Sequence, residues 1–182
     1  MRSRPRPLKS PSWPDWAARD LSWSRLLHRA AARRWVVFSL VAVSRLSDGV
    51  LWYLLILALP WIGGSSGTAC ALRMTVLGAI NLVIYKVLKR HFARPRPYAA
   101  CDSIRACARS LDEHSFPSGH TLHAVSFSML LALYYPQMAW PLGLFTTLVA
   151  LSRVVLGLHY PSDVLIGGAI GFATTKLVLL LF

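Results

Sequence analysis

Residues 116–163 read FPSGHTLHAVSFSMLLALYYPQMAWPLGLFTTLVALSRVVLGLHYPSD, a pair of apolar runs with a polar cluster at each outer end. The runs cover residues 119–135 and 138–156, and Pro136 separates them. Each run has ~17–19 residues, or roughly 26–28 Å as an α-helix, which is close to the thickness of one bilayer core. The pattern therefore predicts two membrane helices that run out and back, with both polar clusters on the same membrane face.

Three polar clusters interrupt the apolar sequence: Lys89–Pro97 (KRHFARPRP), Phe116–Thr121 (FPSGHT) and Ser152–Asp163 (SRVVLGLHYPSD). The first cluster joins the second through a loop without a long apolar run, so we expect it on that same face. Together the clusters offer lysine, arginine, histidine, serine and aspartate side chains. This set is suited to binding a phosphate group and cleaving it from its ester.

The composition indicates a membrane protein of one domain. Of the 182 residues 55% are hydrophobic, and the mean hydropathy of +0.48 is too high for an ordinary soluble domain. A net charge of +13 would suggest nucleic acid as the partner of a soluble protein. Here the positive residues lie at chain ends and in loops, so we expect lipid headgroups of a bilayer and no nucleic acid. The composition carries no signal for an oligomeric state.

The first 34 residues are predicted to lie outside the membrane core. Residues 1–11 are basic and proline-rich, which predicts a disordered tail, and this long polar start does not resemble a signal peptide. Residues 12–34 place tryptophans and leucines at roughly helical spacing among arginines, as in a helix that lies in the headgroup layer. A solvated basic linker is the alternative. We therefore divide the chain into segment 1–34 and a membrane-embedded domain, 35–182.

Residues 35–62 allow two interpretations. Their apolar sequence is interrupted at 44–49 (SRLSDG), where Arg45 and Asp48 would be costly at mid-membrane unless they pair at i,i+3. The segment is either one long broken helix or a short re-entrant or interfacial piece followed by a span.

The rest of the chain predicts further membrane helices. A flexible glycine-rich turn at 63–67 precedes a span at 69–88, and the final span at 162–182 contains small residues that allow close helix packing. With the two central runs, this gives an all-α polytopic membrane bundle of five clear spans and a possible sixth element at 35–47.

The cluster Phe116–Thr121 predicts an anion site at a helix start. Pro117 suits a first helical turn, where Ser118, Gly119 and His120 carry unpaired backbone N–H groups. Gly119 allows a ligand to approach the backbone, the Ser118 hydroxyl adds a donor, and His120 can give a proton to a leaving oxygen. A plain helix start with a capping serine is the alternative.

The cluster Ser152–Asp163 is more specific. Pro161 predicts a second helix start, and from its first turn Asp163 can reach back to His159. A carboxylate on one imidazole nitrogen fixes the tautomer and leaves the other nitrogen as a nucleophile or base. Arg153 can present its planar fork to two phosphate oxygens. The alternative is an interfacial arginine, a capping aspartate and a histidine without a role.

The cluster Lys89–Pro97 supplies the remaining positive charge through Lys89, Arg90, Arg94 and Arg96. Such residues after a span usually anchor it at the membrane surface. A phosphoryl transition state, however, needs its oxygens held by cations, so we expect part of this cluster to bind phosphate.

The three clusters together resemble the signature of the type 2 phosphatidic acid phosphatase superfamily, which also includes bacterial acid phosphatases and vanadium haloperoxidases. The motifs are Lys89-x6-Arg96-Pro97, Pro117-Ser118-Gly119-His120 and Ser152-Arg153-x5-His159-x3-Asp163. They stand in order, and the resemblance covers about residues 45–182. It implies a core like the helical bundle of the haloperoxidases.

The resemblance also implies a role for each motif residue. His159 would be the nucleophile that forms a phosphohistidine, Asp163 would orient it, and His120 would protonate the leaving group. No metal and no other cofactor is implied, because cations of the protein bind the phosphate. The implied phosphate ligands are Lys89, Arg96, Ser118, Gly119 and Arg153.

The expected function is removal of phosphate from a phosphorylated membrane lipid, such as phosphatidate, phosphatidylglycerophosphate, a polyprenyl diphosphate or lipid A. A vanadate-dependent, haloperoxidase-like oxidant and a non-catalytic lipid-binding membrane protein are the alternatives.

The expected location is the cell membrane, crossed several times. Nine Arg and Lys in residues 1–34 favour a cytoplasmic N-terminus, so the site faces the cytoplasm if residues 35–62 cross once and the exterior if they cross twice. Three cysteines are too few for a disulfide scaffold, but Cys101 and Cys107 are close enough in sequence to form one disulfide, which needs an oxidising compartment. This leads us to expect the outer, periplasmic face.

Overall fold

The computed structural model describes residues 15–110 and 112–182, and the tail predicted for residues 1–11 lies outside this part. Every regular element in the described part is a helix, which confirms the all-α prediction. The elements are α1 (Asp15–His28), η1 (Arg29–Ala32), α2 (Arg34–Leu46), α3 (Val50–Phe92), α4 (Pro97–Ala100), α5 (Gly119–Tyr134), η2 (Pro136–Met138), α6 (Ala139–Val155) and α7 (Pro161–Leu181).

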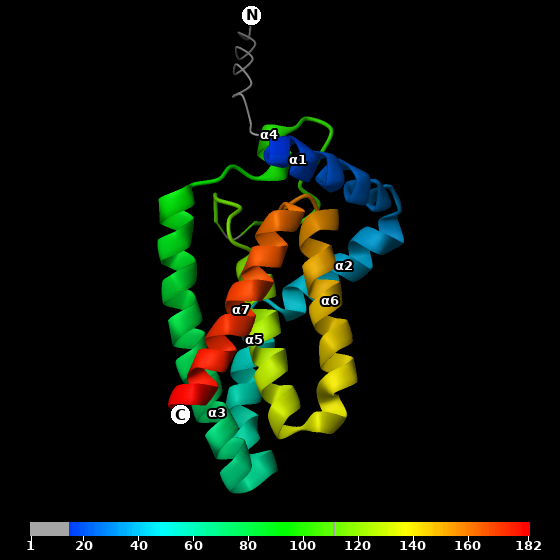
Figure 1. Cartoon of the computed structure of the whole chain (residues 1–182). Coiled ribbons are helices and arrows are strands. Elements are labelled where there is room, and N and C mark those ends of the chain that lie inside the picture. Colours follow the sequence, from blue (N-terminus) through cyan, green and yellow to red (C-terminus); the bar gives the residue numbers. More distant parts are fainter. Residues whose placement is uncertain (1–14, 111) are drawn as a thin grey trace, which may run out of the picture.

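The long helices α3, α5, α6 and α7 run along a common direction, and α1 lies across one end of the bundle (Figure 1). As predicted, α5 and α6 run out and back, joined by η2. Glycines bring α7 against the backbone of α5. A Cβ added at Gly167 would lie 2.6 Å from the carbonyl oxygen of Ser118, and one at Gly171 would lie 2.4 Å from that of Leu122. Small residues therefore allow close packing here, as the sequence predicted.

Helix α3 consists of two arms that meet at Gly64, whose φ of 56° and ψ of −132° are not helical. The chain turns back at this point, so arm 50–63 and arm 65–92 run in opposite directions (Figure 1). A Cβ at Gly67 would lie 2.0 Å from the carbonyl oxygen of Leu59, so the arms touch near the turn. The predicted glycine-rich turn is confirmed.

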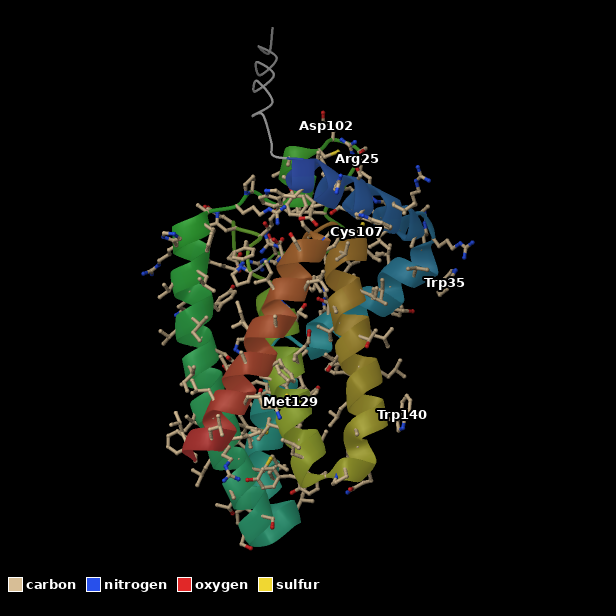
Figure 2. All side chains as sticks on the ribbon, in the orientation of Figure 1. Arg25, Trp35, Asp102, Cys107, Met129 and Trp140 are labelled. Carbon is tan, nitrogen blue, oxygen red and sulfur yellow. The ribbon has the colours of Figure 1, made fainter. Side chains whose placement is uncertain are left out.

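The bundle has the surface of a membrane protein. Three helical stretches of the described chain, Val50–Ala100, Pro136–Val155 and Pro161–Leu181, are long and apolar enough to cross a membrane. Helix α5 has 16 residues, about 24 Å, and falls short of this length. Large apolar side chains point outward, including Trp35 and Trp140 (Figure 2).

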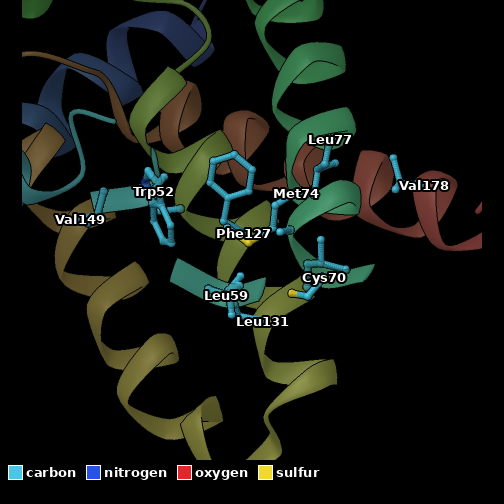
Figure 3. Packing of buried hydrophobic residues seen from close by; sticks show 12 residues of the cluster. Trp52, Leu59, Cys70, Met74, Leu77, Phe127, Leu131, Val149 and Val178 are labelled. Atoms are coloured by element: carbon cyan, nitrogen blue, oxygen red, sulfur yellow. The ribbon is translucent and has the colours of Figure 1, made fainter. Parts of the chain in front are cut away.

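The core joins both arms of α3 to α5. Trp52 and Phe127 are in aromatic contact with ring centroids 5.1 Å apart. In a membrane such packing stabilises through van der Waals contact rather than exclusion of water. The cluster includes Trp52, Leu59, Cys70, Met74, Leu77, Phe127, Leu131, Val149 and Val178 (Figure 3).

Residues 35–62 comprise the short helix α2, a turn and arm 50–63 of α3, and α2 alone is too short for a full span. Helix α2 has 13 residues, about 20 Å, and ends at a turn where Gly49 has a φ of 110°. The i,i+3 pair considered for Arg45 and Asp48 does not form, because the Asp48 carboxylate contacts His120 instead. Helix α1 buries Asp20 against the end of the bundle, while Trp16 and Trp23 remain 59% and 58% exposed.

Candidate active site

The three polar clusters meet at one end of the bundle, as the out-and-back helices predicted. A cavity of about 540 Å³ opens there. Its polar part comes from the end of α3, the start of α5, the end of α6 and the α6–α7 loop. Six predicted site residues line it: Lys89, Arg96, Gly119, His120, Arg153 and His159.

His159 lies in the loop between α6 and α7 and is 1% exposed. Its Nε2 atom faces the cavity, 3.4 Å from Nη1 of Arg96. Its Nδ1 atom is buried and has no hydrogen-bond partner among the described residues. Burial lowers the pKa of His159 well below its usual value of 6.5, and the guanidinium groups of Arg153 and Arg96 act in the same direction. The imidazole is therefore neutral at neutral pH, with a lone pair available for attack.

Asp163 lies in the first turn of α7, as predicted, and is fully buried. Its Oδ2 accepts a hydrogen bond from the backbone N–H of Tyr160 at 2.9 Å, and its Oδ1 accepts one from Nη1 of Arg94 at 2.7 Å. The distance from Oδ2 to Nδ1 of His159 is 3.6 Å. The carboxylate therefore approaches the imidazole but does not form a hydrogen bond with it.

The start of α5 brings Gly119 and His120 to the cavity. A Cβ at Gly119 would lie 2.6 Å from Cε2 of Tyr85, so glycine allows α3 and α5 to approach closely here. His120 contacts Asp48 through Nε2. Ser118 stands at the N-cap position of α5, but its side chain is fully buried and makes no capping hydrogen bond, and its hydroxyl lies 3.0 Å from that of Thr121. The Ser118 side chain thus stands behind the cavity rather than in its lining.

The three predicted cations approach the cavity from different sides. Nη1 of Arg153 donates to Oγ of Ser44 in α2. Nη1 of Arg96 donates to the carbonyl oxygen of Leu158 at 2.8 Å, which fixes the guanidinium beside His159. Lys89 is 8% exposed at its side chain. Several positive groups in one buried place favour binding of an anion.

Asp112 is a site residue that the sequence did not predict. Its carboxylate forms ion pairs with Lys89 and Arg96, at 2.5 Å and 2.8 Å, and accepts a hydrogen bond from Tyr85. Burial raises the pKa of Asp112, but the hydrogen bonds from Lys89 and Tyr85 outweigh this, and the pKa falls to about 2. Tyr85 could have been found because it precedes Lys89 by one helical turn. For Asp112, in an irregular loop, no spacing pointed to the site.

Beyond the polar end, the cavity extends along the two arms of α3. The lining there is apolar and of a size to hold a hydrocarbon chain. It includes Trp52, Leu57, Met74, Gly78, Leu82 and Phe127.

The fold is a membrane-type helical bundle. At one end of an apolar cavity it places a neutral histidine, a buried carboxylate and clustered cations. Such a site is suited to binding and cleaving a phosphate that carries an apolar group. The chain belongs to the PAP2 superfamily, whose family model matches residues 70–182. This confirms the family resemblance drawn from the three motifs.

Similar proteins include undecaprenyl-diphosphatase BcrC of Bacillus subtilis, 32% identical over 117 residues, and the undecaprenyl-diphosphatase of Sulfolobus acidocaldarius, 33% identical over 93 residues. The lipid A 1-phosphatase of Rhizobium johnstonii is 31% identical over 104 residues. These matches cover 64%, 50% and 55% of this chain. They span 60%, 45% and 43% of the relatives' own lengths.

Two solved structures share the fold. They are the transmembrane PAP2-type phosphatidylglycerolphosphate phosphatase of Bacillus subtilis, with a TM-score of 0.75, and Aquifex aeolicus LpxE, with a TM-score of 0.76. Each is 24% identical in sequence, and they cover 92% and 87% of this chain. This chain in turn covers 86% and 93% of theirs.

Proposed function

We propose that this protein is an integral-membrane phosphatase that removes phosphate from a phosphorylated lipid through a phosphohistidine. The observation that carries the proposal is one continuous cavity with His159, His120 and three cations at its polar end and an apolar remainder between the arms of α3. A soluble phosphate ester would leave this apolar part empty.

In the proposed reaction, Nε2 of His159 attacks phosphorus while Arg96 and Arg153 bind the phosphate oxygens. The bond between phosphorus and the leaving oxygen breaks, and His120 gives that oxygen its proton. His120 then takes a proton from a water molecule, which attacks the phosphohistidine and releases inorganic phosphate. The 3.4 Å contact of Arg96 with Nε2 supports this nitrogen as the nucleophile, because Arg96 can contact the phosphate at the same point.

The substrate class is a lipid with a terminal phosphate or diphosphate. Relatives named as undecaprenyl-diphosphatase and lipid A 1-phosphatase support this class without favouring one lipid. The similarity to two kinds of lipid phosphatase also favours a hydrolase over the haloperoxidase-like oxidant and over a non-catalytic lipid-binding protein.

The test is phosphate release by the purified protein from undecaprenyl diphosphate, lipid A, phosphatidate and phosphatidylglycerophosphate in detergent. We expect release from at least one lipid, unchanged by excess EDTA and inhibited by vanadate, which imitates five-coordinate phosphorus. Loss of turnover in EDTA with recovery on adding Mg²⁺ would contradict the metal-independent reaction. No release from any lipid, together with bromide oxidation in peroxide and vanadate, would favour the oxidant.

A second test concerns His159 itself. His159→Ala should lose about 10³-fold or more in rate, and acid-quenched wild-type enzyme should carry labelled phosphate on histidine. His91→Ala, at an exposed position of α3, is the matched control and should retain normal turnover. A His159→Ala protein with near-normal turnover would remove His159 from the mechanism.

The proposed location is the cell membrane, crossed several times, and the side that the site faces can be argued from charge. Helix α1, whose sequence contains Arg19 and Arg25, lies at the same end of the bundle as the start of α7, where Asp163 is (Figure 1). Helix α2 and arm 50–63 together run once toward the opposite end (Figure 1), so residues 35–62 have the arrangement of a single crossing. An excess of Arg and Lys favours the cytoplasmic side.

These features support a site that faces the cytoplasm, in place of the outer face expected from the sequence. The disulfide behind that expectation is absent from the structure, where Cys101 and Cys107 are both free thiols. An impermeant maleimide applied to cells tests the side, with Cys107→Ser as control. We expect Cys107 to react only after the membrane is broken and without reductant. Reaction in intact cells, with or without prior reduction, would restore the outer face.

A further inference from the structure

Arg94 joins α1 to the first turn of α7. Its Nη1 donates to Oδ1 of Asp163 at 2.7 Å and to Oγ of Ser162 at 2.8 Å, while its Nη2 donates to Oδ2 of Asp20 at 2.7 Å. The guanidinium carbon lies 3.8 Å from the centroid of the Tyr160 ring. These contacts use the planar fork of arginine, which lysine cannot reproduce.

Asp20 completes this connection from the opposite side. It is 7% exposed, and its Oδ1 accepts the backbone N–H of Ser162 at 3.1 Å. Its Oδ2 also accepts the Ser162 hydroxyl. A carboxylate at the start of α7 is favoured by the helix dipole. Asp20 therefore caps α7 and at the same time pairs with Arg94, so neither charge is buried alone.

The connection ends at His159. Asp163 is held by Arg94 and by the backbone of Tyr160, and its Oδ2 stops 3.6 Å from Nδ1 of His159. A movement of roughly 0.5 Å would bring this distance close to that of a hydrogen bond. The groups that hold Asp163 therefore decide whether the imidazole is oriented.

We infer that Asp20 and Arg94 are positioning residues of the proposed phosphatase: they hold Asp163 in place, and through it they aim Nε2 of His159 at phosphorus. Helix α1 is thus part of the active site, although Asp20 lies outside the family match over residues 70–182. Arg94, which the sequence grouped with possible phosphate ligands, acts behind the site. The inference rests on the proposed function.

The test compares Asp20→Asn, Arg94→Gln and Arg94→Lys with wild type. Asp102→Asn is the matched control, because it also removes one carboxylate charge but from an exposed position. The Asp102 side chain lies near α1 and points away from the bundle (Figure 2). Rates are measured in single turnovers, with enzyme in saturating excess over substrate. The rate constant then reports the activity of the folded molecules and does not depend on the fraction that is folded.

We expect Asp20→Asn and Arg94→Gln to lower the single-turnover rate constant about tenfold or more, since small misplacements of reacting groups are costly. Arg94→Lys should recover part of the loss, and Asp102→Asn should change nothing. The double variant should lose less than the product of the single losses, because the two residues share one network. The inhibition constant of inorganic phosphate, which is tetrahedral and needs no bond to His159, should stay within about twofold of wild type, because the phosphate ligands are untouched.

Modification of His159 by diethyl pyrocarbonate, followed by mass spectrometry, gives a second readout that needs no turnover. We expect its rate to fall in Asp20→Asn and Arg94→Gln but not in Asp102→Asn. Unchanged rates of modification and of single turnover in both variants would overturn the positioning role. A wild-type protein that releases no phosphate would instead contradict the proposed function, and the modification rates would still decide the role of Asp20 and Arg94.

Discussion

The carboxylate of Asp112 lies 2.8 Å from Nη2 of Arg96, and the same oxygen accepts a hydrogen bond from Lys89. Two of the three cations expected to bind phosphate are therefore paired with an anion that the protein itself supplies. The Oδ1 atom of Asp112 offers both cations an anionic oxygen, as a phosphate would. A substrate phosphate must share Lys89 and Arg96 with Asp112 or displace it.

Asp112→Asn should therefore strengthen anion binding. We expect the inhibition constant of vanadate to fall about tenfold, which corresponds to ~1.4 kcal/mol, because both cations lose a competing charge. Titration of vanadate against lipid phosphatase activity measures this. Glu113→Gln, which removes a charge from the neighbouring residue, is the control. Weaker inhibition in Asp112→Asn would show that Asp112 orients the cations rather than competing for them.

His120 should matter most for substrates with a poor leaving group. His120→Ala should slow hydrolysis of a lipid phosphate ester far more than that of a nitrophenyl phosphate, whose leaving oxygen needs no proton. Asp48→Asn should act in the same direction with a smaller effect, because Asp48 contacts the imidazole. Rates on both substrates give the comparison. Equal losses on the two substrates would argue against His120 as the general acid.

The stability of the protein should depend on the protonation of His159. Its pKa is lowered in the folded state by burial and by Arg153 and Arg96, whereas the unfolded chain has the usual value near 6.5. Below pH ~6.5 the unfolded state binds more protons than the folded state. The free energy of unfolding therefore decreases as the pH falls below this value, and above it this free energy no longer changes through His159. The lowered pKa of Asp112 acts only below pH ~4, between its usual 3.8 and about 2.

His159→Gln, whose side chain does not titrate, measures the effect. The wild-type melting temperature in detergent should rise relative to that of the variant between about pH 5 and about pH 6.5, then stay parallel to it. A difference between the two proteins that is constant over this range would contradict the lowered pKa.

Gly78 should control the length of lipid that the cavity accepts. A Cβ at this position would lie 3.2 Å from Cζ of Phe127, and both residues line the apolar part of the cavity. Gly78→Val should lower kcat/KM about tenfold for a long-chain lipid phosphate and leave a soluble nitrophenyl phosphate unaffected. Gly143→Val, where an added Cβ meets nothing within 4 Å, is the control. An equal loss on both substrates would mean that the substitution disturbs the fold.

Local sequence was sufficient for the helices and for most of the site. The apolar runs and Pro136 predicted α5 and α6, because a helix must match the bilayer in length and proline interrupts it. The same out-and-back arrangement predicted that His120 and His159 would meet. For Ser118, however, spacing alone did not reveal that its side chain would be buried beside Thr121 rather than face the cavity.

The sequence by itself determined the class of fold, the family and the identity of the histidines and cations, because these follow from periodicity and from short motifs on helix ends. Apart from Asp163, which the sequence placed beside His159, only the tertiary structure decided which carboxylates accompany them. Asp20 reaches Ser162 and Arg94, Asp48 reaches His120, and Asp112 reaches Lys89 and Arg96. No local pattern predicts such pairs, because a buried charge is paired by whichever opposite charge the packing of distant segments brings within reach.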